Sequence, residues 1–396
     1  SDCRNTKVDE PWVDQMIRTP YEPAQQATKT YVHLMRAAGD LFGGESLDRL
    51  APRIRAQQPL GENAVTMEEI DQLDAVAATE HIAYDFLARG GKHSRPFITL
   101  AVYDAVSDGS ATLADGAEAV EQLPDWVKRT AMSIETFHKA SLVHDDIEDN
   151  DAYRYGEETL HRQHGLSTAI NVGDYLIGLG YRLVSRDRRE MGAETAADIL
   201  DYLADAHLRL SEGQGAELIW LDSKDKNLKP IDALKVYALK TAPAFESAFY
   251  CGLRLAGPCE EYLEPIRQFS RNLGVAFQIL NDIQDWDYDS DNKNTIGADL
   301  LGGRPTLLWA LALEGLSPAM RQELIELVNE TSLPVERRLQ RARHLYFEAG
   351  VFDKANRLVD KHQQRAEEIA DNIQPDEVRR LMYYLVDTVL DRTMEV

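Results

Sequence analysis

The feature that most constrains the fold of this chain is a helical periodicity that recurs over most of its length. Apolar residues are spaced at i, i+3 and i+4 in long segments, whereas the alternating pattern of strands is scarce. Gly and Pro residues stand mostly at the breaks between these segments. We therefore predict an all-α fold, a large helical bundle with one core, whose long helices lie within 129–149, 165–184, 194–221, 231–256, 260–287, 335–372 and 375–393.

The first part of the chain differs from the rest. Residues 1–65 hold several Pro, Gln and Arg and have a weaker periodicity, so we expect a partly helical N-terminal extension followed by a main domain over 66–396. The chain shows no repeat with a solenoid period and no low-complexity linker.

Charge and cysteine content restrict the partners. With 43 Lys and Arg against 67 Asp and Glu, the formal net charge of −24 argues against a nucleic acid or an anionic membrane as partner. No long uncharged apolar stretch predicts stable membrane insertion. The cysteines Cys3, Cys251 and Cys259 form no C-x-x-C pair, and no apolar signal segment is seen, so we expect a reducing, cytoplasmic setting.

Two aspartate-rich segments end apolar helical stretches: DDIED at 145–149 and NDIQD at 281–285. Carboxylates at i and i+4 project from one helix face, and two such faces can hold hard divalent cations. Magnesium keeps waters and substrate phosphates in its shell, so this pattern predicts a diphosphate substrate. A solvated acidic helix face is the alternative for either copy alone.

The stripe below the first segment suits an apolar tail. Ser141 and Phe137 lie one and two turns before Asp145, and at ~1.5 Å rise per residue Phe137 lies about 12 Å below it. In the second segment, Gln278, Asn281 and Asp285 share a face, with Asp282 beside them. The acidic run from 287 to 292 fails as a calcium loop, because Asn292 stands at the turn glycine and Ala298 at the terminal glutamate.

Few basic residues are placed where they could bind a diphosphate. In GGKHSRP at 90–96, Lys92 and Arg95 follow a glycine break at a helix start, which suits an oxyanion. Arg154 follows the first acidic segment, and Lys240-Thr241 precedes Pro243 inside a helical stretch. Proline leaves a carbonyl four residues back without its donor, which could stabilise a cation beside the site; an ordinary proline kink in a core helix is the alternative.

Together these residues resemble the trans-isoprenyl diphosphate synthases (polyprenyl synthetases) over about 70–396. The matching elements are GGKHSRP at 90–96, HKASLVHDDIED at 138–149, RYGEETLH at 154–161, NVGDYL at 171–176, GQGAEL at 213–218, Lys240-Thr241 and GVAFQILNDIQDW at 274–286. The resemblance implies an isoprenoid synthase bundle, usually a homodimer, with a central cavity lined by the two Asp-rich helices.

It also implies the function and the site. The enzyme would be a prenyltransferase that condenses an allylic diphosphate with isopentenyl diphosphate, with about three Mg²⁺ per site and Mn²⁺ as an alternative. The roles carried over are metal binding by Asp145, Asp149, Asn281, Asp282 and Asp285; binding of the allylic diphosphate by Arg154 and Lys240; and binding of isopentenyl diphosphate by Lys92, Arg95 and His138. The catalytic residues would be Lys240, beside the allylic diphosphate, with Thr241 and Gln278 at the reacting carbons, where a carbonyl and the Gln278 side chain can stabilise positive charge.

Three positions depart from the family pattern. Tyr155 stands where a second arginine is usual, so we expect a weakened or altered acceptor diphosphate site. Asn281 replaces an aspartate but keeps an oxygen for a metal, and Arg304, with Lys293 nearby, stands where lysines are usual.

Two alternatives stay open. Asn281, Asp285 and Asp289 at i, i+4 and i+8 are similar to the second metal motif of class I terpene cyclases. A cyclase needs no isopentenyl clamp, whereas this chain keeps one. The other alternative is a non-catalytic subunit of a heteromeric synthase.

Product length has one indicator. Members that stop at C15 often carry aromatic residues four or five positions before the first aspartate, where this chain has Ser141 and Ala140. Phe137 is the next candidate floor, so we predict a C20 or longer product.

Overall fold

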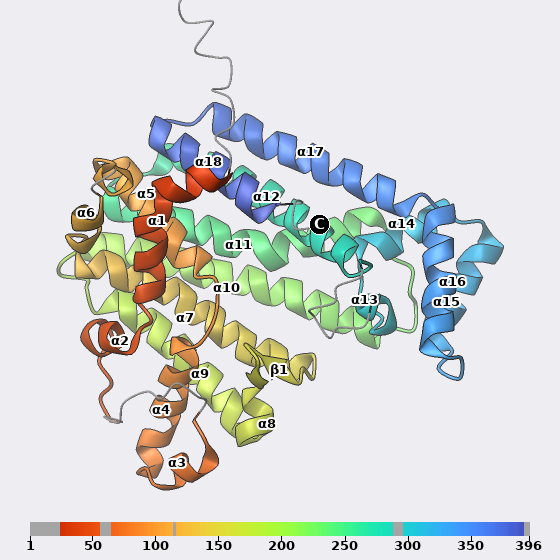
Figure 1. Cartoon of the computed structure of the whole chain (residues 1–396), viewed down its shortest axis with the longest axis horizontal. Coiled ribbons are helices and arrows are strands. Elements are labelled where there is room, and N and C mark those ends of the chain that lie inside the picture. Colours follow the sequence, from red (N-terminus) through yellow and green to blue (C-terminus); the bar gives the residue numbers. More distant parts are fainter. Residues whose placement is uncertain (1–23, 56–64, 114–115, 288–295, 392–396) are drawn as a thin grey trace, which may run out of the picture.

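The computed structural model describes residues 24–55, 65–113, 116–287 and 296–391, and these residues form a helical bundle (Figure 1). The predicted all-α fold is confirmed. In the described residues the strands are limited to a short antiparallel pair, β1 (Tyr153–Arg154) and β2 (Glu157–Glu158), directly after the first acidic segment. Asp289, Asn292 and Lys293 lie outside the described residues.

The helices of the first half are α1 (Ala24–Asp40), α2 (Gly44–Leu50), α3 (Met67–Asp71), α4 (Ala75–Ala88), α5 (Ser94–Ser107), η1 (Ser110–Thr112), α6 (Ala117–Glu121), α7 (Asp125–Glu148), α8 (Leu160–His164) and α9 (Leu166–Ser185). Those of the second half are α10 (Ala193–Asp222), α11 (Pro230–Ala256), η2 (Glu260–Tyr262), α12 (Leu263–Gln284), α13 (Ala298–Leu301), α14 (Leu307–Gly315), α15 (Pro318–Asn329), α16 (Val335–Glu348), α17 (Val351–Asp371) and α18 (Asp376–Val389).

The predicted helical segments correspond to long helices of the bundle, with one difference. The segment 335–372 is split into α16 and α17 at Gly350, which has φ 65°, a left-handed conformation that ends a helix and favours glycine. The apolar spacing continues through this corner because both helices bury one face against α14. Periodicity therefore located the buried faces but not the break.

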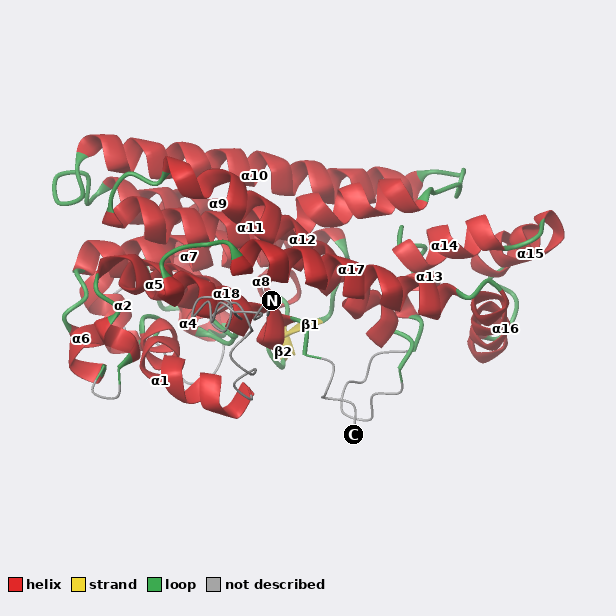
Figure 2. Ribbon diagram, turned by 90° about the horizontal axis from the view of Figure 1, so that it is seen from above, coloured by secondary structure: helices red, strands yellow, loops and turns green. Residues whose placement is uncertain are grey.

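Helix α11 is the centre of the bundle. It packs against α5, α7, α10, α12 and α14, and its residues from Thr241 to Leu255 are almost all buried. Figures 1 and 2 show α7, α9, α10 and α11 running alongside one another, with α15 and α16 at the opposite end from α1 to α6. Within the described residues, no helix combines the length and apolar character needed to cross a bilayer.

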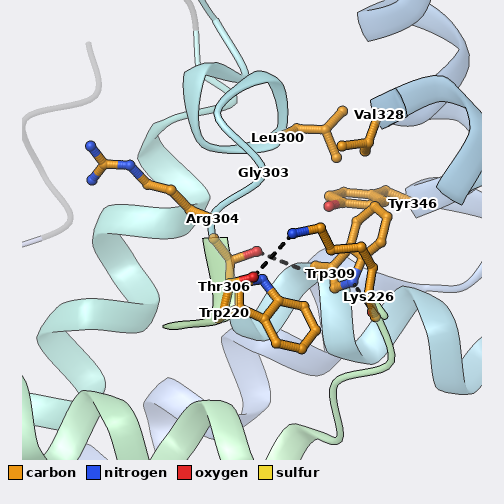
Figure 3. A pocket seen from close by; sticks show the side chains of 9 residues that line it. All are labelled: Trp220, Lys226, Leu300, Gly303, Arg304, Thr306, Trp309, Val328 and Tyr346. Carbon is orange, nitrogen blue, oxygen red and sulfur yellow. Dashed lines mark hydrogen bonds between the residues drawn. The ribbon is translucent and has the colours of Figure 1, made fainter. Parts of the chain in front are cut away.

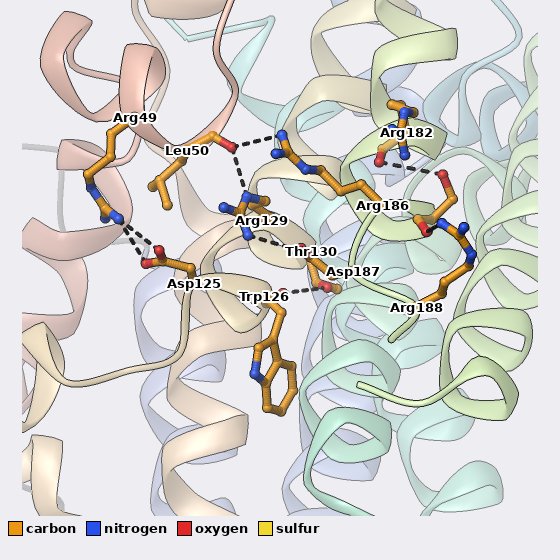
Figure 4. Close-up of polar contacts among 11 residues, drawn as sticks. Arg49, Leu50, Asp125, Trp126, Arg129, Thr130, Arg182, Arg186, Asp187 and Arg188 are labelled. Carbon is orange, nitrogen blue, oxygen red and sulfur yellow. Dashed lines mark hydrogen bonds and ion pairs between the residues drawn. The ribbon is translucent and has the colours of Figure 1, made fainter. Parts of the chain in front are cut away.

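The described part of the N-terminal extension is attached to the bundle. The backbone carbonyl of Leu50 accepts hydrogen bonds from Arg129 Nε at 2.8 Å and Arg186 Nη1 at 3.4 Å, and Arg49 pairs with Asp125 at 2.9 Å (Figure 4). Helix α1 packs on α5, the helix that follows the glycine-rich loop. The extension thus supports the start of α5 from outside.

Candidate active site

Close helix packing sets the position of the candidate site around Lys240 and Thr241 in α11. A Cβ at Gly213 of α10 would lie 2.9 Å from Leu239 Cβ, and one at Gly274 of α12 would lie 3.1 Å from the Ala242 nitrogen. The two glycines therefore let α10 and α12 approach α11 from two sides, and the helix continues through Pro243. The carboxyl ends of α7 and α12, which carry the acidic segments, are brought to this point.

The first acidic segment divides its aspartates between two environments. Asp145 and Asp149 are partly exposed, and burial raises the pKa of both carboxyls, that of Asp145 to about 7, with Glu148 adding to the shift. Asp146 is 2% exposed and pairs with Arg154, whose Nε lies 3.2 Å from its carboxylate oxygens. Arg154, predicted to bind the allylic diphosphate, is thus held by the buried aspartate of the motif.

The second acidic segment is divided in the same way. Asn281 is exposed, while Asp285 accepts the backbone N–H of Asp299 at 3.1 Å, and burial raises its pKa to about 6. Asp282 is 7% exposed and accepts a hydrogen bond from the Tyr237 hydroxyl, which itself accepts the Leu307 N–H at 2.8 Å. Successive helical residues point about 100° apart, so a residue beside the metal-facing stripe can face the core. In this structure Asp282 therefore faces the core, and its role as a metal ligand stays a prediction.

Arg304 connects the end of the first acidic segment with α13. Its guanidinium lies 3.7 Å from Asp149, the residue that follows α7, and 3.7 Å from Asp299 of α13. It also borders a small pocket lined by Trp220, Lys226, Leu300, Gly303, Thr306, Trp309, Val328 and Tyr346, and its side chain points away from the aromatic residues of that pocket (Figure 3). The charge of Arg304 therefore belongs to the acidic site rather than to the pocket.

Lys240, Thr241 and Gln278 lie together as the sequence predicts. The Lys240 ammonium pairs with Glu217 of α10, and its charge opposes the raised pKa of both Asp145 and Asp299. Gln278 Nε2 of α12 donates to Thr241 Oγ1 of α11 at 2.5 Å. The amide and the hydroxyl thus form one polar contact beneath the carboxylates.

The carboxylates around Arg304 and Lys240, which we call the acidic region, could bind divalent cations whose remaining ligands are other oxygens. Among the described residues, no three Asp, Glu, His or Cys side chains are close enough to hold an ion by themselves. Burial and mutual repulsion nevertheless raise the pKa of Asp145, Asp149, Asp285 and Asp299, so the carboxylates lack counter-charge. Asp145 and Asp149 could each give a ligand to ions whose remaining ligands are water and a diphosphate.

A second cluster gathers the basic residues of the predicted acceptor clamp. Lys92 is exposed on the loop before α5, and Arg95 lies in the first turn of that helix. Burial lowers the pKa of Arg95, which Glu135 of α7 opposes, and burial with the nearby cations Arg95, Lys139 and Arg154 holds the pKa of His138 well below its ordinary value. The structure therefore brings Arg95 and His138 together, as predicted.

Residues that the sequence analysis did not select complete both clusters. Glu217 and Asp299 belong to the acidic region, and Glu135 and Lys139 lie beneath the basic one. Glu135 and Lys139 lie four apart on α7, and Glu135 precedes His138 by three, so helical spacing from His138 could have indicated the first of them.

The predicted chain-length residues lie on α7 in three environments. Phe137 packs against Gly180 and Tyr181 of α9, with a distance of 4.8 Å between the two ring centroids. Ala140 is 1% exposed, and Ser141 is exposed and donates to the His138 carbonyl at 2.7 Å. Of these three residues, Phe137 is thus the one whose large side chain packs between α7 and α9.

Known proteins share both the sequence and the fold. A sequence model of the polyprenyl synthetase family matches residues 76–343. A geranylfarnesyl diphosphate synthase of Aeropyrum pernix is 31% identical over 76% of this chain and 91% of its own length. An octaprenyl diphosphate synthase of Escherichia coli is 28% identical over 68% of this chain and 76% of its own length.

Solved structures agree with this relationship. A geranylgeranyl pyrophosphate synthetase from Pyrococcus horikoshii superposes with a TM-score of 0.71 at 25% identity, covering 92% of this chain and 98% of that one. A polyprenyl synthase from Caulobacter crescentus, complexed with calcium and isoprenyl diphosphate, gives a TM-score of 0.69 at 25% identity over 91% of this chain and 98% of its own.

Proposed function

The chain belongs to the polyprenyl synthetase family, and from this premise we propose that it condenses an allylic diphosphate with isopentenyl diphosphate to give a trans-prenyl diphosphate of C20 or longer. The observation that carries the proposal is the pairing of an acidic region with a basic one, both of them beside α7. The acidic region offers sites for cations on a leaving diphosphate. The basic region offers a separate site for a second diphosphate.

In the proposed reaction the allylic C–O bond breaks and its electron pair leaves with the diphosphate. The double bond of isopentenyl diphosphate then forms the new C–C bond, and a proton is lost to the departed diphosphate. Divalent cations, Mg²⁺ with Mn²⁺ as a substitute and about three per site, would neutralise the leaving diphosphate. Asp145, Asp149 and Asn281 are the proposed ligands, and Asp285 supports the third ion.

The protein's own contribution is positioning and electrostatics. Lys240 contacts the allylic diphosphate when Glu217 releases it, while Arg154 adds charge from behind Asp146. Thr241 and Gln278 present their dipoles to the allylic cation. Lys92, Arg95 and His138 hold the acceptor diphosphate.

The setting of the enzyme is part of the proposal. We propose a main domain over 66–396 that works as a homodimer in the cytoplasm. The buried and unbridged cysteines Cys251 and Cys259 support a reducing compartment.

Incubation with isopentenyl diphosphate, magnesium and the C5, C10 or C15 allylic diphosphate, with products identified by mass, tests the function. Chain-extended diphosphates support it. Hydrocarbons or alcohols formed without isopentenyl diphosphate would indicate a terpene cyclase. No turnover together with tight binding to another synthase would indicate a non-catalytic subunit.

A further inference from the structure

Lys139 is a fully buried lysine beneath the glycine-rich loop, one residue after His138. Its relative exposure is 0%, and its ammonium donates to the backbone carbonyl of Gly90 at 3.1 Å and to that of Arg89. A buried charge is costly unless it is paired and hydrogen-bonded, so two carbonyls turned toward it are a specific arrangement. The lysine fixes the loop from its inner side.

Tyr155 covers this ammonium from outside. The Lys139 nitrogen lies 4.1 Å from the Tyr155 ring centroid and 5.3 Å from that of Phe86, distances at which a ring face attracts a cation. Tyr155 has φ 54°, a conformation that is uncommon for a bulky residue. This unusual backbone conformation at Tyr155 places its ring over the Lys139 ammonium.

The loop and the ring are fitted to each other. A Cβ at Gly90, whose φ is 56°, would overlap the Tyr155 ring atoms, so the ring lies against bare backbone. Because Gly90, Gly91 and His93 all have positive φ, the carbonyls of Arg89 and Gly90 turn inward to Lys139. A turn of this kind can direct successive N–H groups outward as an anion-binding concavity.

The next residues are fixed by the N-terminal extension. The His93 ring stacks on Phe42, which lies between α1 and α2, with 5.0 Å between their centroids. The loop that carries Lys92 is thus held from the extension on one side and by Lys139 on the other.

The charges around Lys139 leave a positive excess. Glu135 is 2% exposed and acts on both Arg95 and Lys139, so one carboxylate faces two cations. Burial lowers the pKa of Lys139 to about 8, which Glu135 opposes. An anion on the outer side of the loop would balance this excess.

We propose that Lys139 and Tyr155 form a positioning pair for the acceptor diphosphate. In this pair the Lys139 ammonium beneath the glycine-rich loop takes the place of the arginine that the family usually has at position 155, beside the loop. The inference rests on the proposed function and reverses one expectation from the sequence. Tyr155 does not merely remove a charge, because its ring closes the site of another one. An arginine at position 155 would place its guanidinium near the Lys139 ammonium and lose the ring.

A double-mutant cycle tests the pair: the unmodified protein, Lys139→Met, Tyr155→Arg and the variant with both changes, each assayed for KM of isopentenyl diphosphate, KM of the allylic diphosphate and kcat. We expect each single change to raise the KM for isopentenyl diphosphate by about tenfold. The allylic KM should stay within about twofold, because Lys240 and the metal ligands are untouched. The variant with both changes should be no worse than either single one, since a methionine at position 139 leaves room for the charge of an arginine at position 155.

Two matched controls separate this role from structural support. Lys128→Met makes the same change on the same helix, where Lys128 donates to the Glu121 carbonyl, and should leave both KM values unchanged. Tyr155→Phe keeps the ring and should bind isopentenyl diphosphate like the unmodified protein, whereas Tyr155→Leu should bind it more weakly.

Independent effects that multiply to about a hundredfold in the variant with both changes would overturn the pair. Tighter binding of isopentenyl diphosphate by Tyr155→Arg alone would also overturn it. In both cases the unmodified protein still extends chains, so the proposed function stands. Failure of the unmodified protein to extend any chain would overturn that function, and this inference with it.

Discussion

In the acidic and the basic regions beside α7, burial shifts the pKa values of the ionisable side chains in opposite directions. In the acidic region burial raises the pKa of Asp145, Asp149, Asp285 and Asp299. In the basic region it lowers the pKa of Arg95, His138 and Lys139. Each region therefore concentrates one sign of charge without enough of the other.

The difference indicates what each region is built to receive. Carboxylates with raised pKa values gain most from cations, and ammonium or imidazole groups with lowered values gain most from an anion. In a chain with a net charge of −24, the basic region is the exception, and its cations come from α5, α7 and the segment after α7. Breaking one region should thus leave binding at the other intact.

The largest expected effect is loss of a carboxylate from the acidic region. Asp145→Asn should lower kcat/KM by about 10²–10³-fold, because a carboxylate that would hold a cation on the leaving diphosphate becomes a neutral amide. The thermal shift that magnesium and an allylic diphosphate cause together should shrink in parallel. The KM for isopentenyl diphosphate should hold.

Glu148→Gln is the matched control for that change. Glu148 is exposed on the same helical turn and accepts a hydrogen bond from Gln214 at 2.8 Å. Its loss should alter kcat/KM by no more than a few fold. Equal effects of the two changes would mean that general acidity, rather than the Asp145 position, serves the site.

The next largest effect tests whether Asp282, in the second acidic segment, stabilises the core rather than binding a metal. Tyr237→Phe removes the hydroxyl between Asp282 and the Leu307 N–H, and should lower the free energy of unfolding by about 1–3 kcal/mol. Urea titration measures it, with Tyr153→Phe at a 66% exposed position as control. A loss of magnesium affinity with unchanged stability would instead return Asp282 to the metal site.

The sequence could predict the regions but not their inner partners. Helical spacing places Asp145 and Asp149 on one face. It places Asp282 off the face that Asn281 and Asp285 share, but it cannot show that Asp282 points into the core and accepts a hydrogen bond from Tyr237. Local spacing likewise cannot show that the chain turns back after Asp149 and brings Tyr155 over Lys139. That contact depends on the left-handed backbone conformation of Tyr155, which the loop sequence does not indicate and which tertiary packing selects.

The basic region should respond to pH with a sign set by Lys139. Its pKa in the folded protein, about 8, lies below the ordinary value of 10.5, so its charged form costs stability at lower pH and that cost disappears as pH rises through 8 to 10.5. Above pH 8 the ammonium is lost while Tyr155, whose pKa is raised to about 12, stays neutral.

The KM for isopentenyl diphosphate should accordingly rise up to about tenfold from pH 7 to 9, as the folded lysine deprotonates. The profile of Lys139→Met, already weakened at pH 7, should be flat over that range. Parallel profiles for both proteins would assign the titration to another group.

The smallest effect on rate should come from Phe137, whose ring packs against Tyr181 of α9. Phe137→Ala opens the space that the ring fills against Gly180 and Tyr181, so the longest product should gain at least one C5 unit while both KM values change little. Gly180→Ala acts on the same ring from the other helix, because its Cβ would lie 2.8 Å from the Phe137 ring atoms and must displace them. Product lengths that shift in both variants, but not in Phe347→Ala at a 61% exposed position, would identify this ring as the floor. If neither variant changed the longest product, the tail could not run along this face of α7.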